Sequence, residues 1–288
     1  MTSTTEIKAG EVQKLRQTTG AGLMDCKHAL TETKGDMDKA MRLLRERGIA
    51  KSSKRADRVA AEGRIDFSLS ADQKSAVMIE LNCETDFVAR NDEFIALGQT
   101  YLKLIQANPN WTSAAQVPTE PTLELAAKIG EKLGLKNFVR FQVASQGLVG
   151  TYIHPGSKLG VMVQLDTDKN VTEELKNLAR EICIQIAGAN PLYVSKNDVP
   201  ADILQREKDI TKKQMEGQNK PADVLEKIAI GKLQVFFEAN CLLEQPHVRD
   251  ASGKTRIQGL IESVEKKEGI KIKVTKFVRL RVGADSNP

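Results

Sequence analysis

The sequence predicts an α+β fold with an N-terminal three-helix module, a core of two related antiparallel-sheet-plus-helix subdomains, and a projecting helical hairpin. Three observations predict it. The first 56 residues contain three short apolar stripes at helical spacing. Two pairs of consecutive strands follow, each leading into an amphipathic helix, and strands that follow one another directly pair antiparallel. Two helical segments between 201 and 240 are largely polar.

This pattern divides the chain into segments with different roles. We predict an N-terminal module at 1–56, a first core subdomain at 57–142, a second core subdomain in two parts at 143–200 and 241–283, a helical hairpin at 201–240 between those parts, and a disordered tail at 284–288.

Apolar residues three or four positions apart predict each helix of the N-terminal module. The three stripes are Val12 and Leu15 in Ala9–Thr18; Leu23, Cys26 and Leu30; and Met37, Ala40, Met41 and Leu44. We expect Gly48 to end the third helix, since glycine is common just beyond a helix end. The polar and basic stretch Ser52–Val59 then reads as a linker.

A weak internal repeat relates the two core subdomains. Val59-Ala-Ala-Glu-Gly63 is echoed by Val143-Ala-Ser-Gln-Gly147, and MIELNCETD at 78–86 parallels MVQLDTD at 162–168. Each strand pair leads into a helix, around 94–105 in the first copy and 175–186 in the second. Between the copies we predict a helix at Leu123–Leu133 and a strand at Phe138–Val143.

The hairpin and the C-terminal elements follow from composition and periodicity. Ala201–Gly217 and Pro221–Ala239 are separated by a glycine and a proline at the positions where these residues end and begin helices. The first of the two helices is too polar to be buried, which indicates a projecting hairpin. Thr255–Lys267 is amphipathic, and a strand from Ile270 to Val278 is expected to complete the second sheet.

The stretch around Phe87 breaks a strand pattern. Apolar residues alternate up to Leu81, after which Thr85 and Asp86 are both good helix N-cap residues. Phe87 and Val88 then lie in a connection that carries no further strand. An apolar pair there either folds back as a hydrophobic staple, which the residues alone favour, or is presented to a partner.

These residues also resemble a known family. Thr-Asp-Phe-Val-Ala after an Asn-Cys-x strand end resembles the signature of the bacterial elongation factor Ts family, and Leu15–Leu30 resembles its N-terminal module. The similarity continues through Lys128–Glu131, Tyr152–Val161 and the C-terminal strand. The resemblance implies that the N-terminal module is of the ubiquitin-associated type and that the hairpin is an antiparallel coiled coil.

The resemblance also implies a function in translation elongation. Members of this family bind the GTPase elongation factor Tu and promote release of its GDP by disrupting the Mg²⁺ and phosphate site. They act as guanine-nucleotide exchange factors that catalyse no covalent step, so we expect no catalytic residue, cofactor or metal. Family members occur in one-to-one complexes and as dimers, which leaves a homodimer through the core open.

The family's motifs assign candidate partner-binding residues. Phe87 matches an aromatic residue that inserts between helices of the partner's GTP-binding domain, and Thr85, Asp86 and Val88 complete the segment associated with Mg²⁺ dislocation. The other matching positions are Arg16, Leu23, Met24, Lys27, Ile129, Gly130 and His154. From the residues alone, Leu23 is also compatible with a core position, and Gly130 with a simple helix end.

Two features depart from the family pattern. Glu84 stands where glutamine is common, which adds a charge beside Phe87. Pro155-Gly-Ser-Lys158 enlarges the turn after His154.

Composition excludes several other classes. Aromatic residues make up 4% of the chain, which gives base stacking little to build on, so we expect no direct nucleic-acid partner. The four cysteines are dispersed without a CxxC pair, and the sequence shows no signal peptide and no apolar run near the ~18 residues of a spanning helix. We therefore expect a cytoplasmic protein that does not enter membranes.

No sequence motif indicates an enzyme. Phosphate-binding, dinucleotide-binding, nucleophile-elbow and zinc-protease motifs are all missing from the sequence. The three histidines lie far apart, and none neighbours a candidate nucleophile. The main alternative to the exchange factor is therefore a non-catalytic adaptor that acts through the ubiquitin-associated-like module alone.

Overall fold

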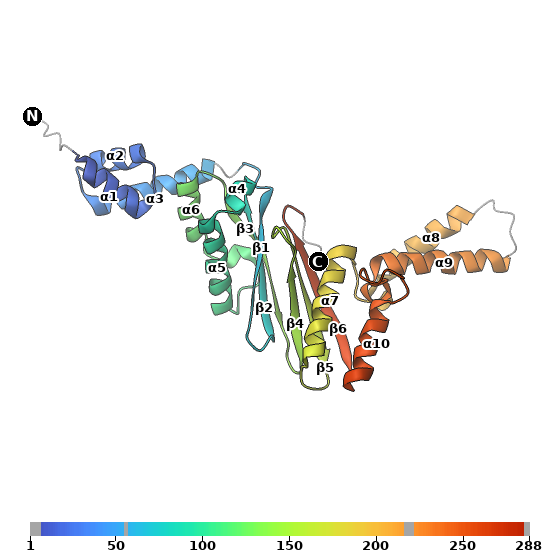
Figure 1. Ribbon diagram of the computed structural model, residues 1–288. Coiled ribbons are helices and arrows are strands. Elements are labelled where there is room, and N and C mark those ends of the chain that lie inside the picture. The colour runs from blue at the N-terminus through green and yellow to red at the C-terminus, as the bar shows by residue number, and fades with distance from the viewer. Residues whose placement is uncertain (1–6, 55–56, 216–221, 285–288) are drawn as a thin grey trace, which may run out of the picture. The chain divides into compact units, whose positions relative to one another are not determined.

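The computed structural model describes residues 7–54, 57–215 and 222–284 and confirms the α+β class (Figure 1). The chain forms two compact units. The first takes residues up to 66 together with 79–139 and 282–284, and the second takes 67–78 and 140–281. The predicted turn at 217–221 and the predicted tail beyond 284 lie outside the described residues.

Three helices form the N-terminal module, as predicted: α1 (Ala9–Thr19), α2 (Leu23–Glu32) and α3 (Met37–Lys54). They share a small core made of Val12, Leu15, Cys26, Ala29, Leu30, Ala40 and Leu44. The prediction that Gly48 ends the third helix is wrong, because α3 continues to Lys54. A Cβ at Gly48 would lie 3.1 Å from the Cβ of Ala127, so this glycine permits a close helix contact instead.

The first sheet has the strand order β1 (Glu62–Leu69), β2 (Ser75–Cys83) and β3 (Gly134–Gln142). Helices α4 (Asp86–Ala89) and α5 (Asp92–Ala107) follow β2, and the 3₁₀ turn Ala114–Gln116 leads to α6 (Glu120–Ile129). The predicted helix to Leu133 is too long. α6 ends where Gly130 adopts a left-handed conformation with φ of 88°, which leaves four residues before β3 begins, earlier than predicted.

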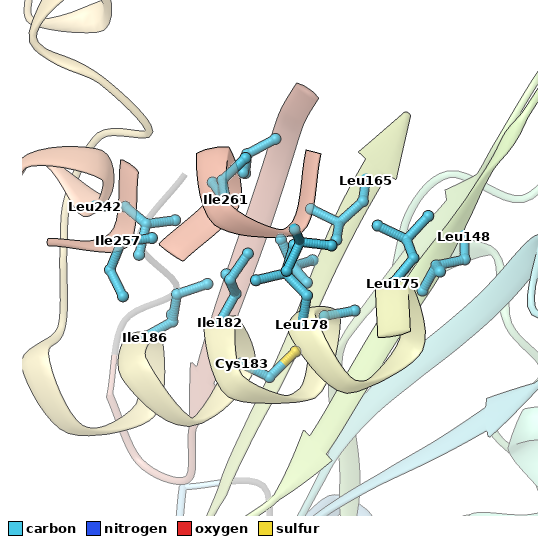
Figure 2. Packing of buried hydrophobic residues seen from close by; sticks show 14 of the residues in the cluster. Leu148, Leu165, Leu175, Leu178, Ile182, Cys183, Ile186, Leu242, Ile257 and Ile261 are labelled. Carbon is cyan, nitrogen blue, oxygen red and sulfur yellow. The ribbon is translucent and has the colours of Figure 1, made fainter. Parts of the chain in front are cut away.

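The second sheet has the order β4 (Gly147–Ile153), β5 (Leu159–Thr167) and β6 (Ile272–Arg281), and both strand pairs are antiparallel. The C-terminal strand therefore completes this sheet, as predicted. Helices α7 (Glu173–Ala189) and α10 (Ile257–Glu268) pack on it. Figure 2 shows Leu178 and Ile182 of α7 meeting Ile261 of α10 and Leu165 of β5 in one apolar cluster.

The internal repeat has a structural counterpart at two glycines. Gly63 and Gly147 have φ of 150° and 141°. A Cβ at Gly63 would lie 2.1 Å from the carbonyl oxygen of Leu81, and one at Gly147 would lie 2.2 Å from that of Leu165. Both copies therefore require glycine where the first strand starts against its neighbour.

The two copies also bring strand and helix together at equivalent places. In the first, Gly98 of α5 allows the Asp66 carboxylate to approach, and an added Cβ would lie 2.8 Å from its oxygen. In the second, Gly150 of β4 allows Ala179 of α7 to approach, and an added Cβ would lie 2.8 Å from the Ala179 Cβ. The glycine is thus on the helix in the first copy and on the strand in the second.

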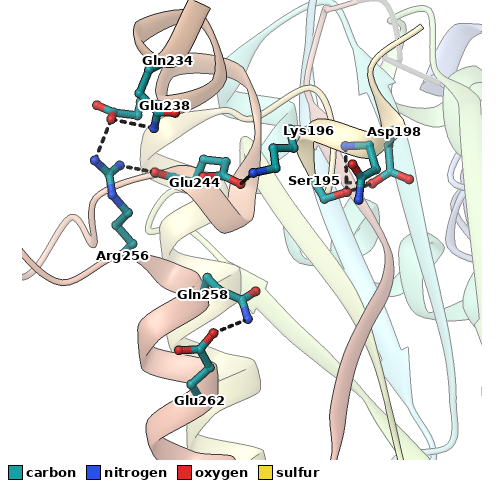
Figure 3. A network of polar contacts seen from close by, with 10 residues as sticks. Ser195, Lys196, Asp198, Gln234, Glu238, Glu244, Arg256, Gln258 and Glu262 are labelled. Carbon is teal, nitrogen blue, oxygen red and sulfur yellow. Dashed lines mark hydrogen bonds and ion pairs between the residues drawn. The ribbon is translucent and has the colours of Figure 1, made fainter. Parts of the chain in front are cut away.

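The hairpin consists of α8 (Ala201–Met215) and α9 (Ala222–Asn240), with 3₁₀ turns at Lys196–Asp198 before it and Leu242–Glu244 after it. Figure 3 shows the polar contacts where the hairpin joins the rest of the second unit. The Arg256 guanidinium donates to the Glu238 carboxylate at 2.6 Å and to the carbonyl oxygen of Glu244 at 2.5 Å. The end of α9 is therefore tied to the start of α10.

Candidate partner-binding site

Thr85 starts the short helix α4. Its backbone is extended, with φ of −123°, and its hydroxyl accepts a hydrogen bond from the Val88 N–H at 3.4 Å. Asp86 is the first helical residue, so the prediction that Asp86 also caps the loop is wrong. The Asp86 carboxylate instead pairs with Arg90 one turn later at 3.0 Å. A carboxylate in the first turn of a helix is favourable because it faces unpaired N–H groups.

Phe87 and Val88 have opposite environments. Val88 is buried, with 8% of its surface exposed, whereas Phe87 is 82% exposed. Successive residues of a helix point about 100° apart, so turning Val88 inward leaves Phe87 in solvent. The hydrophobic staple that the residues alone favoured is therefore wrong for Phe87.

Glu131, in the loop after α6, holds the start of α4. Its carboxylate accepts hydrogen bonds from the N–H groups of Glu84 and Thr85, both at 3.1 Å, and from the Thr85 hydroxyl at 2.6 Å. In return, the Glu84 carboxylate accepts from the Lys132 N–H at 2.6 Å. We call these four residues, Glu84, Thr85, Glu131 and Lys132, the two-carboxylate clamp.

Arg58 fastens a further segment to the clamp. Its guanidinium donates to the Glu84 carboxylate at 3.2 Å, and its carbonyl oxygen accepts from the Lys132 ammonium at 2.9 Å. The extra charge at Glu84 is therefore neutralised within the loop and is not presented beside Phe87.

Ile129 and Gly130 immediately precede Glu131. Ile129 is half-buried, and Gly130 is exposed with no atom near the position of an added Cβ. Gly130 ends α6 in a left-handed conformation, so its presence has a backbone reason besides any partner contact. Next to them, Lys128 pairs with Glu93 on α5 and also covers Gly20, at the end of α1.

The N-terminal candidates are all exposed. Leu23 and Met24, at the start of α2, are 50% and 58% exposed. The predicted stripe is therefore wrong for Leu23, which does not join the buried Cys26 and Leu30. With Arg16 on α1 and Lys27 on α2, these side chains combine apolar and basic groups on the module's surface.

His154 belongs to the second unit, whereas the other candidates belong to the first. It is exposed in the turn between β4 and β5, and its Nδ1 lies 3.1 Å from the Tyr152 hydroxyl. The turn is closed by bonds from the His154 N–H to the Leu159 carbonyl at 2.9 Å and from the Ser157 N–H to the His154 carbonyl at 3.0 Å. The enlarged turn is thus an ordered one.

Sequence reasoning missed Arg58, Glu131 and Lys132. Glu131 lay within the quoted Lys128–Glu131 match, but its partner Thr85 is 46 positions away, and no local pattern announces that pairing. Within 7–54, 57–215 and 222–284, no three His, Cys, Asp or Glu side chains gather as a metal site would require. Over the same ranges, no helix combines the length and apolar character needed to cross a membrane.

Comparison with known proteins identifies the family. Residues 84–284 match the family described as Elongation factor TS. A curated Elongation factor Ts of Clostridium botulinum (strain Eklund 17B / Type B) is 41% identical over 286 residues, which cover 96% of this chain and 93% of the relative.

Two relatives from other genera agree. The Elongation factor Ts of Prosthecochloris aestuarii is 41% identical over 291 residues, and that of Chlorobaculum parvum is 38% identical over 292 residues. Each alignment covers 97% of this chain and 99% of the relative. With the motif around Phe87 and the α+β architecture already described, these matches show that the chain belongs to the elongation factor Ts family.

Proposed function

We propose that this chain is the guanine-nucleotide exchange factor of the GTPase elongation factor Tu. It binds the GDP-bound GTPase, disrupts the Mg²⁺ and phosphate site, and promotes GDP release so that GTP can bind. The observation that carries the proposal is the side chain of Phe87, 82% exposed on a capped and clamped turn. In this proposal the protein makes and breaks no covalent bond, needs no cofactor, and works in the cytoplasm.

The mechanism is one of differential affinity. A GTPase holds its nucleotide through a phosphate-cradling loop, a lysine and a Mg²⁺ ion that bridges phosphate and protein. A protein that binds the GTPase more tightly when those contacts are broken lowers its affinity for GDP by that difference, and so promotes GDP release. Thermodynamic linkage then requires that bound GDP weakens the GTPase's affinity for the exchange protein by the same ratio.

Phe87 suits insertion into a partner for two reasons. An aromatic side chain brings a large apolar area with only two rotatable bonds to immobilise, and such residues dominate binding energies at interfaces. An exposed aromatic fixed on an ordered turn also costs less conformational entropy on binding than one on a flexible loop. Asp86 lies next to it with a half-buried carboxylate that can accept partner hydrogen bonds.

The remaining candidates extend the proposed interface. Arg16, Leu23, Met24 and Lys27 offer an exposed mixed surface on the N-terminal module, Ile129 and Gly130 adjoin the clamp, and His154 contributes from the second unit. A homodimer through the core remains compatible with this arrangement.

The test is release of a fluorescent GDP analogue from elongation factor Tu in stopped flow. We expect the wild type to accelerate release by orders of magnitude and Phe87→Ala to lose about thirtyfold of that, since truncating a hot-spot aromatic costs about 2 kcal/mol and each 1.4 kcal/mol is about tenfold. Val248→Ala is the matched control, because Val248 is also an exposed apolar residue, at 49%, outside the site. We expect it to match the wild type.

The outcomes separate the alternatives. Acceleration by wild type with no loss in Phe87→Ala would keep the exchange function but move it away from α4. No acceleration by folded wild type would sink the proposal and favour the adaptor, whose supporting observation is the exposure of Leu23 and Met24.

A further inference from the structure

We propose that Glu131 is a positioning residue for Phe87. Glu84, with Lys132 and Arg58, completes the set of contacts that holds the loop carrying Phe87 in place. The proposal rests on the proposed function, because holding Phe87 in place matters to exchange only if Phe87 enters the partner. Glu84 and Glu131 lie within the motifs that resemble the family, but none of these four residues is among the candidate partner contacts.

Helix α4 is too short to be stable without contacts from elsewhere in the fold. It has four residues, Asp86–Ala89, and helices this short are far below the length at which backbone hydrogen bonds alone stabilise them. The N–H groups just before and at the start of a helix also have no partner within it. Glu131 supplies acceptors for two of these N–H groups and for the capping hydroxyl of Thr85.

The two loops of the clamp hold each other reciprocally. Glu131 accepts from the backbone of residues 84 and 85, and Glu84 accepts from the backbone of residue 132. Hydrogen bonds to ionised carboxylates are about twice as strong as those between neutral groups. Two loops separated by almost fifty residues thus fix each other, and neither moves without breaking charge-assisted bonds.

Arg58 attaches a further segment of the chain to the clamp. This residue follows α3 of the N-terminal module, and it contacts both Glu84 and Lys132. The chain leaving the module that carries Leu23 and Met24 is therefore anchored on the loop that carries Phe87. The contacts of Arg58 therefore link two of the proposed partner-binding surfaces, the N-terminal module and the loop with Phe87.

These contacts predict a particular kinetic effect. A loosened loop must be ordered when it binds, so the loss falls on affinity. Once bound, Phe87 still occupies the same place, so the maximal rate is kept. In Phe87→Ala the inserted group itself is missing, and the maximal rate falls instead.

The experiment compares Glu131→Gln with wild type in the GDP-release assay, over a range of factor concentrations. Glutamine has the same shape, but its single oxygen cannot replace both carboxylate acceptors. We expect the half-saturating concentration to rise about tenfold, the effect of losing one or two charge-assisted bonds, while the maximal rate stays within about twofold of wild type. Hydrogen exchange should become faster at the amides of Glu84 and Thr85.

Glu124→Gln is the matched control. Glu124 is an exposed glutamate on α6 whose contact with Arg45 spans 3.8 Å, and it does not touch the clamp. We expect this variant to match wild type in half-saturation and amide exchange. Glu84→Ala and Glu84→Gln form a second pair, which carries the test if Glu131→Gln does not fold: alanine removes the acceptor for the Lys132 N–H, whereas glutamine keeps one.

The results distinguish the clamp from the function. If wild type accelerates GDP release and Glu131→Gln equals it in half-saturation and amide exchange, the clamp proposal is overturned and the function stands. A fall in maximal rate with unchanged half-saturation also overturns it. If wild type does not accelerate release, the proposed function fails, and unchanged amide exchange in Glu131→Gln would then overturn the clamp as well. Faster amide exchange with raised half-saturation, absent in Glu124→Gln, supports it.

Discussion

Four consecutive residues at the start of α4 have four separate tasks. Thr85 caps the helix and is held by Glu131, Asp86 carries a charge paired with Arg90, Phe87 points outward, and Val88 is buried. Each neighbour needs the others in place, because the direction of Phe87 is set by burial of Val88 and by the cap. A substitution at any of them therefore has a distinct expected effect.

Asp86→Asn tests whether the Asp86 charge serves the fold or the partner. The Asp86 and Arg90 side chains are 40% and 79% exposed, and such surface pairs contribute only about 0–1 kcal/mol. We expect little change in the melting temperature but severalfold weaker binding to elongation factor Tu in titration calorimetry. Arg90→Ala is the control. Equal weakening by Arg90→Ala would show that Asp86 acts only through its pairing with Arg90.

Motif reasoning at the residue scale singled out Thr85 and Phe87 as candidates, but it did not give their surroundings. Thr85 is a recognisable cap residue because its hydroxyl acts locally. Its bond to Glu131 depends on the tertiary fold, as does the exposure of Leu23, which has the spacing of a core residue. Periodicity assigns a residue to a face, and the packing of neighbouring helices decides how wide the buried part of that face is.

At the scale of elements, the hairpin is anchored by a buried pair of amides as well as by Arg256. Gln185 and Gln245 are both fully buried, and Gln185 donates to the side chain of Gln245 at 3.1 Å and accepts from the Val248 N–H at 2.8 Å. Gln245 donates in turn to the carbonyl of Ala239 near the end of α9 at 3.1 Å. Buried polar groups satisfied in this way give a unique geometry to the junction.

Arg256→Ala is expected to loosen that junction without unfolding the protein. Arg256 links Glu238 of α9 to the Glu244 carbonyl, so amide exchange should rise over 236–244 while the melting temperature changes little. A hydrogen bond from Gln234, followed by that from Arg256, lowers the pKa of Glu238 below its ordinary 4.5. The ionised Glu238 carboxylate therefore stabilises the folded state fully above pH 4.5, and this contribution is lost as the pH falls through the lowered pKa. Arg206→Ala, on α8, is the exposed control.

NMR titration of Glu238 checks the same contact directly. Its pKa should rise toward the ordinary value in Arg256→Ala and remain unchanged in Arg206→Ala. A pKa that stays low in Arg256→Ala would show that Gln234 alone is responsible.

Element types were predictable here, while element ends were not. The strands and helices follow from periodicities of two and of about 3.6 residues. The end of α3 does not follow from periodicity, because the helix continues past Gly48. Glycine is favoured at this position because Ala127 of another helix packs closely against it. The end of α6 depends similarly on Gly130, whose left-handed backbone no apolar pattern marks.

At the scale of the whole molecule, the four cysteines are all free and buried, in separate parts of the fold. Cys26 lies in the core of the N-terminal module, Cys183 in that of the second unit, and Cys241 at the end of the hairpin. Burial raises the pKa of all three thiols above the ordinary 9.0, and raises that of Cys241 to about 11. They behave as small apolar residues, as the sequence indicated.

Stability is therefore expected to fall at alkaline pH. Above pH 9 the unfolded chain releases thiol protons that the folded chain still holds, so the free energy of unfolding decreases as the pH rises toward 11. Thermal unfolding at pH 7, 8, 9 and 10 measures this. Cys183→Ala should be less stable at pH 7 because it leaves a cavity, but it should lose less stability between pH 8 and 10. If Cys183→Ala lost as much stability between pH 8 and 10 as the wild type, the buried thiol of Cys183 would not be the cause of the alkaline loss.

The order of segments along the chain was predictable because the repeat is visible in the sequence. Val59–Gly63 and Val143–Gly147 mark the two starts, and both glycines prove necessary to the strand contacts that follow. The domain boundaries at 57, 143, 201 and 241 stay a proposal, since local patterns fix element types better than the limits of cooperative units.

The reversed placement of the small residues has a consequence for how such a duplicated chain assembles. During folding, each helix encounters two similar sheets, and mismatched pairing is a hazard of repeated architectures. In the native pairing the glycine of α5 faces Asp66, and Ala179 of α7 faces the glycine of β4. We expect an exchange of the two helices to be disfavoured, because it would bring Ala179 to Asp66 and Gly98 to Gly150, and neither pair combines a larger side chain with a glycine.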